Sequence, residues 1–307
     1  MKLLTQKNPI IRFLYPRLGK LHQHSPKPFV IPKSYYRPKP LSLFPKISIV
    51  TPSFNQGIFL EKTILSVVQQ KYPDIEFIIQ DGESKDNSVE VIKKYQDRLN
   101  FWESKKDNGQ SHAINLGFTH SSGDIMAYLN SDDLLLPGTL NYVAHYFETH
   151  PDVDVVYGHR IVIDENNFEV GRWILPPHSN EMLDWIDFVP QETLFWRRKI
   201  WNKAGGFIDE NFQFAMDWDL LLRFKNAGAN FARLPRFLGA FRVHSLQKTS
   251  SQMNETGFKE MTALRLRSHN RVVSQSEIKR KMIPYFLKHI VYHKLHRLKN
   301  IFITNKI

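Results

Sequence analysis

The feature that most constrains the fold is a series of short apolar runs, each followed by a helical stretch, that begins at Lys46. The strand-like runs are residues 47–51, 75–79, 101–103 and 124–129. Alternating strands and helices predict βαβ units with right-handed crossovers and a mostly parallel sheet. The chain is therefore predicted to contain an α/β domain of Rossmann-like layout, with helices flanking a central sheet.

Polar side chains follow the first four predicted strands at the points where the strands end. They are Asn55, Asp81, Asp107 and Asp132. Open α/β sheets bind ligands in the crevice outside the carboxyl ends of their strands. The sequence therefore predicts a ligand site along this edge of the sheet.

The last of these positions belongs to the cluster Asn130-Ser131-Asp132-Asp133, which directly follows an apolar strand. Carboxylate oxygens on a rigid strand end suit Mg²⁺ or Mn²⁺ bridged to a substrate diphosphate. The chain has no cysteine, so a metal would have to be held by carboxylates, amides or histidines. The alternative interpretation is that one of the two acids only caps the next turn.

The second half of the domain predicts a mixed sheet. Strands are expected at residues 153–157, 160–164 and 237–243, with helices at 179–186 and 216–227.

Two residues near these elements have two possible roles each. Asp217, at the start of its helix, either complements the helix dipole or acts as a general base. His244, after the last strand, is either a metal ligand or a solvated loop residue.

Positive charge is concentrated at the two ends of the chain. Residues 1–46 hold ten Lys and Arg without an acid, and residues 264–307 hold eleven against Glu277, so the net charge of +12 leaves −8 in the centre. An acidic centre between basic ends favours a bound cation near an anionic surface over a duplex-reading domain, so no nucleic acid partner is expected. Residues 1–45, which are rich in proline, are predicted to be an extended arm, and residues 251–307 a basic helical extension.

Near the C-terminus, apolar residues recur among Lys, Arg and His. They are Tyr285, Phe286, Ile290, Val291, Leu295 and Leu298. This pattern predicts a basic amphipathic helix, broken near Pro284, which either binds anionic lipid or packs on the core. The N-terminus lacks a secretory signal pattern and no apolar run is long enough to span a bilayer. The expected location is the cytoplasm, with the chain peripheral on the cytoplasmic face of the membrane.

Six motifs occur in the order found in one known family. They are Ile47-Ser-Ile-Val-Thr-Pro-Ser-Phe-Asn55, Ser66-Val-Val-Gln-Gln70, Asp81-Gly-Glu-Ser-Lys-Asp86, Gly123-Asp124, Leu129-Asn-Ser-Asp-Asp133, and Gly205-Gly-Phe207 followed by Met216-Asp-Trp-Asp219. From Ile47 to about Ser250 the sequence thereby resembles family 2 glycosyltransferases, especially bacterial members that build surface polysaccharides. The resemblance implies a GT-A fold over residues 46–250, with a nucleotide-binding half at 46–135 and an acceptor-binding half at 136–250.

The resemblance also implies roles for individual residues. Contacts to the nucleotide-sugar are expected from Thr51, Pro52, Asn55, Asp81, Asn108, Gly109, Asn130 and Ser131. Asp132, in the family's DXD element, and His244 would bind Mn²⁺ or Mg²⁺, and Asp217 would be the catalytic base. Acceptor contacts are expected from Gln191, Trp196, Trp218 and Arg242.

The implied activity is inverting transfer of a sugar from a nucleotide-sugar, in particular a UDP-sugar, to a hydroxyl of a saccharide or lipid-linked saccharide. Two departures from the family pattern bear on it. Asn130 replaces the first acid of the DXD element, and Met216 replaces the acid that often precedes the base.

Two alternatives to this function come from other classes. A sugar-phosphate nucleotidyltransferase would need a glycine-rich basic loop after the first strand, and residues 51–55 supply none. The other is a non-catalytic basic protein that binds membranes or polyanions through its ends on a degenerate scaffold.

Overall fold

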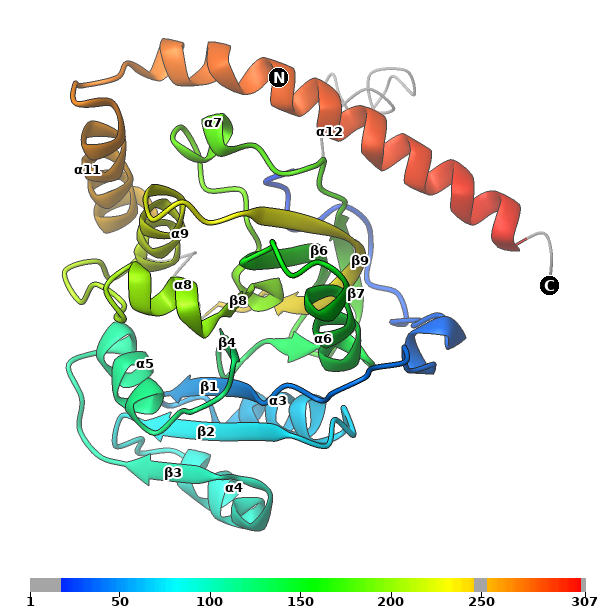
Figure 1. Cartoon of the computed structure of the whole chain (residues 1–307), viewed down its shortest axis with the longest axis vertical. Coiled ribbons are helices and arrows are strands. Elements are labelled where there is room, and N and C mark those ends of the chain that lie inside the picture. The colour runs from blue at the N-terminus through cyan, green and yellow to red at the C-terminus, as the bar shows by residue number, and fades with distance from the viewer. Residues whose placement is uncertain (1–17, 246–252, 305–307) are drawn as a thin grey trace.

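The computed structural model describes residues 18–245 and 253–304, which build a single mixed sheet with helices on both faces (Figure 1). The strands are β1 (Ile47–Ser53), β2 (Ile75–Asp81), β3 (Phe101–Ser104), β4 (Ile125–Tyr128), β5 (Leu134–Leu135), β6 (Val155–Ile163), β7 (Glu169–Trp173), β8 (Phe195–Arg197) and β9 (Phe231–Arg242). Their order is β3-β2-β1-β4-β8-β6-β9-β5, and β7 pairs with β6.

Helices connect the strands and extend the chain beyond the sheet. They are α3 (Gly57–Val68), α4 (Ser88–Lys94), α5 (Gln110–Thr119), α6 (Thr139–Thr149), α7 (Asn180–Leu183), α8 (Arg198–Lys203), α9 (Met216–Asn226), α11 (Phe258–His269) and α12 (Gln275–Thr304). Short helical turns are η1 (Lys33–Tyr36), η2 (Gln96–Arg98), η3 (Gln191–Thr193) and η4 (Met253–Gly257).

The strand pairing confirms the predicted fold class. β1 runs parallel to both β2 and β4, and β2 runs parallel to β3, so the first half of the sheet consists of βα units. In the second half β8 is antiparallel to both β4 and β6, while β6 and β9 form a long parallel pair. The sheet is therefore mixed, and its long pairs are parallel.

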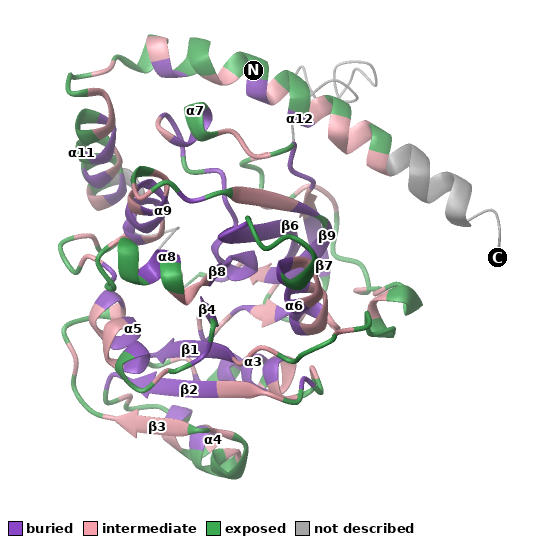
Figure 2. Ribbon diagram, in the orientation of Figure 1, coloured by how far each residue is buried: buried purple, intermediate pink, exposed green. Residues whose placement is uncertain are grey.

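Each face of the sheet is covered by a separate apolar core. Alternate residues of β1 point to opposite sides: Val50 joins the core under α5 and α9, whereas Ile47 and Ile49 join the core under α3 and α6. All seven residues of β1 are buried, as expected for a strand covered on both faces (Figure 2). At Gly117 of α5 a Cβ would lie 2.4 Å from a methyl of Val50, so glycine lets this helix approach the sheet closely.

Two sequence predictions about elements in the second half are corrected, and one strand was not predicted. The two strands predicted at 153–157 and 160–164 form one strand, β6, because the ladder with β9 continues past Gly158 through register shifts. The helix predicted at 179–186 is confined to α7. β8 was not predicted, because a three-residue strand is too short to show an alternating pattern.

The basic arm and α12 meet on one side of the molecule. The backbone N–H of Leu18 in the arm donates to Nε2 of His289 in α12 at 3.0 Å. Lys27 of the arm also forms an isolated antiparallel β-bridge with Glu169 of β7. The first 17 residues of the predicted arm lie outside the described residues. Among the described helices, none combines the length and hydropathy that a membrane-spanning segment needs.

α12 continues through Pro284, so the predicted break there is wrong. A proline within a helix leaves one carbonyl without its usual donor. Contacts on both sides of it hold the helix, since Ile278 and Tyr285 are both buried against the body of the protein. Of the predicted apolar residues in this helix, Tyr285 faces the core and Val291 is exposed, and the side chain of Leu298 lies outside the described set.

Candidate active site

A cavity of about 570 Å³ opens beyond the carboxyl ends of β1, β2 and β4. Its lining residues come from the polar segments that follow these strands and from the start of α5. They are Pro52, Ser53, Phe54, Gln56, Gly82, Lys106, Asp107, Gly109, Gln110, Ala113, Asn130, Ser131, Asp132 and Phe241. The ligand site predicted along this edge therefore exists as a cavity.

Asp132 and His244, the two predicted metal ligands, lie in direct contact. His244 Nε2 donates to Asp132 Oδ2 at 2.8 Å, although 112 residues separate the two in the sequence. The histidine side chain is only 1% exposed and its ring packs on Phe59, which rules out the solvated loop residue. Asp132 lies at the cavity wall with 18% of its side chain exposed.

The donor atoms present fit Mn²⁺ or Mg²⁺ only together with a substrate. In the described ranges no group of three or more His, Asp or Glu side chains could hold a metal by itself. Asp132 and His244 offer a carboxylate and an imidazole, and His244 Nδ1 is buried without a hydrogen-bond partner. Sites for Mg²⁺ that use one or two protein groups are completed by substrate phosphates and water. This pair and a diphosphate would form such a site.

Asn130 is fixed by a chain of amide hydrogen bonds across the cavity wall. Gln110 Nε2 donates to Asn130 Oδ1 at 2.7 Å, and Asn130 Nδ2 donates to Gln191 Oε1 at 3.2 Å. Gln191 in turn donates to the carbonyl of Tyr128 at 2.8 Å. The Asn130 amide both accepts and donates a hydrogen bond, which a carboxylate could not do. A neutral amide therefore fits this position, where the DXD element has an acid.

Arg242 forms hydrogen bonds that hold the turn containing Asp132 and Asp133. Its backbone N–H donates to Asp133 Oδ1 at 2.9 Å and its Nε donates to the carbonyl of Asp132 at 2.8 Å. Its guanidinium also donates to Asn167 Oδ1 at 2.8 Å. Burial and the charge of Asp132 raise the pKa of Asp133 well above its usual range. Asp133 is therefore a buried structural residue, and Asp132 is the member of the pair that faces the cavity.

Asp217 lies in the first turn of α9, where its Oδ1 accepts the N–H of Trp218 at 2.9 Å. Burial raises the pKa of this carboxyl to about 6, against the lowering effects of backbone N–H groups and of Arg160. Arg160 is itself buried and donates through Nε to Glu192 at 2.8 Å. The same guanidinium also lowers the pKa of Asp133, so one buried cation acts electrostatically on both acidic segments.

The N-terminus of α9 is capped from another helix. Glu260 of α11 accepts the backbone N–H groups of Gln213, Phe214 and Ala215, each at 2.8 Å. Ala215 occupies the N-cap position and has no side-chain acceptor of its own. A carboxylate here satisfies these donors and complements the positive end of the helix dipole. Glu260 thus fixes the segment that leads into Asp217.

Four residues predicted to contact the nucleotide-sugar do not line the cavity. The side chain of Thr51 is fully buried, and Asp81 is buried and accepts from Ser84 and Ser104. Asn55 and Asn108 are exposed, and Asn55 accepts the N–H of Lys85. Pro52, Gly109, Asn130 and Ser131 do line the cavity, as does Gly82, the neighbour of Asp81.

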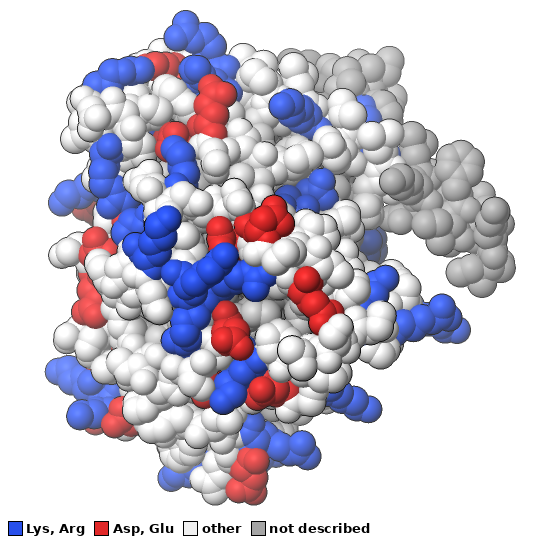
Figure 3. Space-filling model, in the orientation of Figure 1, with Lys and Arg blue, Asp and Glu red and all other residues white. Residues whose placement is uncertain are grey.

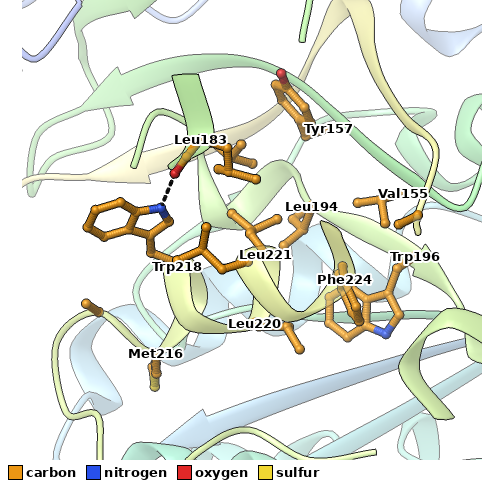
Figure 4. Packing of buried hydrophobic residues seen from close by; sticks show 14 of the residues in the cluster. Val155, Tyr157, Leu183, Leu194, Trp196, Met216, Trp218, Leu220, Leu221 and Phe224 are labelled. Atoms are coloured by element: carbon orange, nitrogen blue, oxygen red, sulfur yellow. Dashed lines mark hydrogen bonds between the residues drawn. The ribbon is translucent and has the colours of Figure 1, made fainter. Parts of the chain in front are cut away.

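The structure corrects three of the four acceptor predictions. Trp196, Trp218 and Arg242 are fully buried, so none of them presents surface to an acceptor. Trp218 donates through Nε1 to the carbonyl of Leu183 at 2.7 Å, and Trp196 packs in the same core (Figure 4). Gln191 is 8% exposed and reaches the site through Asn130.

The sequence did not predict several of the cavity residues, and four of these are aromatic, cationic or bonded to Asn130. Phe54 is 61% exposed and Phe241 is the penultimate residue of β9, and these two aromatic rings border the cavity. Lys106 supplies a cation, and Gln110 fixes Asn130. Phe54 and Lys106 stand next to predicted strand ends, so their positions could have been identified. Phe241 could not, because its strand reaches the cavity only in the folded sheet.

The family model for glycosyl transferase family 2 matches residues 48–211, more than half of the chain. An uncharacterized glycosyltransferase of Nostoc sp. is 34% identical over 171 residues, which are 52% of this chain and 53% of the relative. The chain thus matches about half the length of that relative. The GalNAc(5)-diNAcBac-PP-undecaprenol beta-1,3-glucosyltransferase of Campylobacter jejuni is 30% identical over 40% of each chain.

Solved structures share the fold. The crystal structure of S. aureus TarS 1-349 in complex with UDP-GlcNAc has a TM-score of 0.61 at 16% identity, covering 80% of this chain and 73% of that one. The mannosyltransferase PcManGT from Pyrobaculum calidifontis, in complex with GDP-Man and Mn2+, has a TM-score of 0.59 at 14% identity, covering 84% and 72%. These similarities confirm the GT-A fold, and the family match shows that the chain belongs to glycosyl transferase family 2.

Proposed function

We propose that this glycosyltransferase inverts the anomeric configuration as it transfers a sugar from a UDP-sugar to a hydroxyl of a saccharide or lipid-linked saccharide. The observation that carries the proposal is the cavity at the strand ends, with the Asp132–His244 pair at its wall. The relative from Campylobacter jejuni, whose name describes a lipid-linked acceptor, and the UDP-GlcNAc complex of TarS support these substrate classes.

In this proposal the cavity binds the nucleoside diphosphate of the donor. Phe54 and Gly82 border it near the end of β2, where a nucleobase would contact the exposed ring. A Cβ on residue 82 would lie 2.8 Å from Asp107 Oδ2 and 3.3 Å from the Phe54 ring, so glycine leaves room for both side chains here. Mn²⁺ or Mg²⁺, held by Asp132 and His244 with the diphosphate, would neutralise negative charge on the leaving group.

The transfer itself is proposed to be a single displacement. An acceptor hydroxyl oxygen bonds to the anomeric carbon as the bond from that carbon to the diphosphate oxygen breaks. Asp217 takes the hydroxyl proton, and the diphosphate departs with the bonding electron pair. Attack from the face opposite the leaving group inverts the anomeric centre. The residues 46–250 remain our proposed catalytic domain, with a donor half at 46–135 and an acceptor half at 136–250.

A donor screen tests the proposal. The full chain is incubated with UDP-, GDP- and dTDP-sugars, with and without Mn²⁺, and release of the nucleoside diphosphate is measured. We expect release to require the metal and to be fastest with a UDP-sugar. Release from none of the three donor classes, with or without an added saccharide acceptor, would contradict the proposal.

Glu260 provides a test of how α9 is held. Replacement of Glu260 by glutamine is expected to destabilise the protein by about 1–3 kcal/mol, because three backbone N–H groups at the start of α9 lose a charged acceptor. The displaced helix start should also lower kcat, since Asp217 lies only two residues beyond Ala215. Urea unfolding and initial rates measure the two effects.

The matched control for this variant is Glu181→Gln. Glu181 is also a helical acid, but its side chain is 73% exposed and pairs only with Lys281. The control should change neither stability nor rate. If Glu260→Gln were as stable and as active as the control, the cap would have no positioning role.

A further inference from the structure

Helix α12 has apolar residues on two opposite faces. One face packs on the body of the protein, where Tyr285 contacts the ring of Phe188 at 4.9 Å between centroids and His289 is fully buried. The other face carries Ile283, Leu287, Val291 and Leu295, and their exposed fractions are 55%, 59%, 54% and 50%. Figure 2 shows this alternation along the helix. We call these four residues the outer stripe.

The outer stripe is contiguous. Its residues recur every four positions, so they lie one above the other on the helix surface and extend for roughly 18 Å along it. Single exposed apolar residues are common on soluble proteins, whereas an ordered row of large ones marks an interaction surface. Within the described residues nothing covers the outer stripe, because all four side chains are at least half exposed.

Beyond its first turn, α12 carries charges of one sign only. Lys279, Arg280 and Lys288 are exposed on α12. No Asp or Glu follows Glu277 in the sequence, so this helix offers no acid beyond its first turn. In Figure 3 mainly basic side chains lie over the first half of α12, at the top of the view, with acidic ones beside its start. A partner that fits this surface must be apolar in its interior and negatively charged at its boundary.

We propose that the outer stripe of α12 docks the protein on an anionic lipid bilayer. The helix would lie in the plane of the membrane, with the stripe at the boundary between headgroups and acyl chains and with the cations on anionic headgroups. The same charges argue against a second copy as the occupant. Two such faces would bring the cations beside the stripe close together, and α12 carries no acid beyond its first turn to pair with them. The proposal goes beyond sugar transfer and does not depend on it.

The test is sedimentation of the full chain with lipid vesicles. One set of vesicles is pure phosphatidylcholine and the other also contains phosphatidylglycerol. The wild-type protein should sediment with the second set only. The variant Ile283→Ser, Leu287→Ser, Val291→Ser should bind these vesicles at least about tenfold more weakly, since three apolar contacts are lost. The matched control is Leu266→Ser, Val272→Ser, which changes residues 47% and 77% exposed outside the stripe and should bind like the wild type.

A second variant tests the charges. Lys279→Glu, Arg280→Glu, Lys288→Glu keeps the stripe and should also lose at least about tenfold in binding to the anionic vesicles. Because all substituted residues are exposed, the variants should keep the circular dichroism spectrum and unfolding midpoint of the wild type.

Several results would overturn the proposal. They are wild-type protein that stays in solution with both kinds of vesicle, equal binding to both kinds, and a serine variant that binds as tightly as its control. Analytical ultracentrifugation without lipid tests whether a second copy of the chain binds the stripe. A dimer that forms without lipid and disappears in the serine variant, with no binding to vesicles, would assign the stripe to a second copy of the chain.

Discussion

Replacing Asp217 with asparagine is expected to lower kcat for sugar transfer by about 10²–10⁴-fold and to leave the donor KM nearly unchanged. Asparagine keeps the size of the side chain and an oxygen that can accept the N–H of Trp218. It cannot take up the proton of the acceptor hydroxyl. Initial rates at saturating donor and acceptor measure the loss, and Asp97→Asn, an exposed acid in η2, serves as the control.

The pH dependence of the rate gives an independent readout. A carboxyl acts as a base only in its deprotonated form, and burial raises the pKa of Asp217 to about 6. The wild-type kcat should therefore be constant above this pH and fall about tenfold per unit below it. The asparagine variant should lose this acid limb. Unchanged transfer by the variant would exclude Asp217 as the base, and absence of transfer by the wild type would favour the non-catalytic alternative.

Replacing Asp132 with asparagine should lower transfer at limiting Mn²⁺ by at least about 100-fold, because the cavity loses its charged metal ligand. The His244 imidazole alone would then remain beside the diphosphate. Titration of Mn²⁺ into the protein with UDP, followed by calorimetry, should show weaker binding of the metal. Calorimetry separates a loss of metal from a loss of chemistry, which activity alone cannot do.

Two further variants sharpen this result. His244→Gln should weaken metal binding less than Asp132→Asn, since it removes a neutral ligand. Asn130→Asp restores the acid of the family's DXD element and should strengthen metal binding. It should also destabilise the wall of the cavity, because a carboxylate cannot donate to Gln191. Equal metal binding by the wild type and the Asp132→Asn variant would contradict the assignment.

The first half of the fold could be predicted from the sequence because its information is local. β1 and β2 are short, mainly apolar runs followed by helical spacing, and polar residues follow at the end of each strand. The second half was harder for a physical reason. β8 has three residues and is held by neighbours on both sides, so its conformation is decided by tertiary pairing and not by its own pattern.

Site residues could be predicted where they directly follow a predicted strand. Asp132 follows a strand, and its position at the cavity wall agrees with that placement. The burial of Trp196 and Arg242 was not predictable, since only the folded sheet and its covering helices show that both side chains are fully buried. The hydrogen bond from Phe214 N–H to Glu260 joins residues 46 positions apart in the sequence. Local sequence patterns cannot predict such a contact.

The cap on α9 also bears on how this protein can be shortened. A fragment that ends at residue 211, where the family match stops, would lack Asp217. A fragment that ends at residue 250 would contain Asp217 but lack the Glu260 carboxylate that caps α9. The second boundary leaves the backbone N–H groups of Gln213, Phe214 and Ala215 without their acceptor. A recombinant fragment intended to retain turnover must therefore run at least through His269, the end of α11.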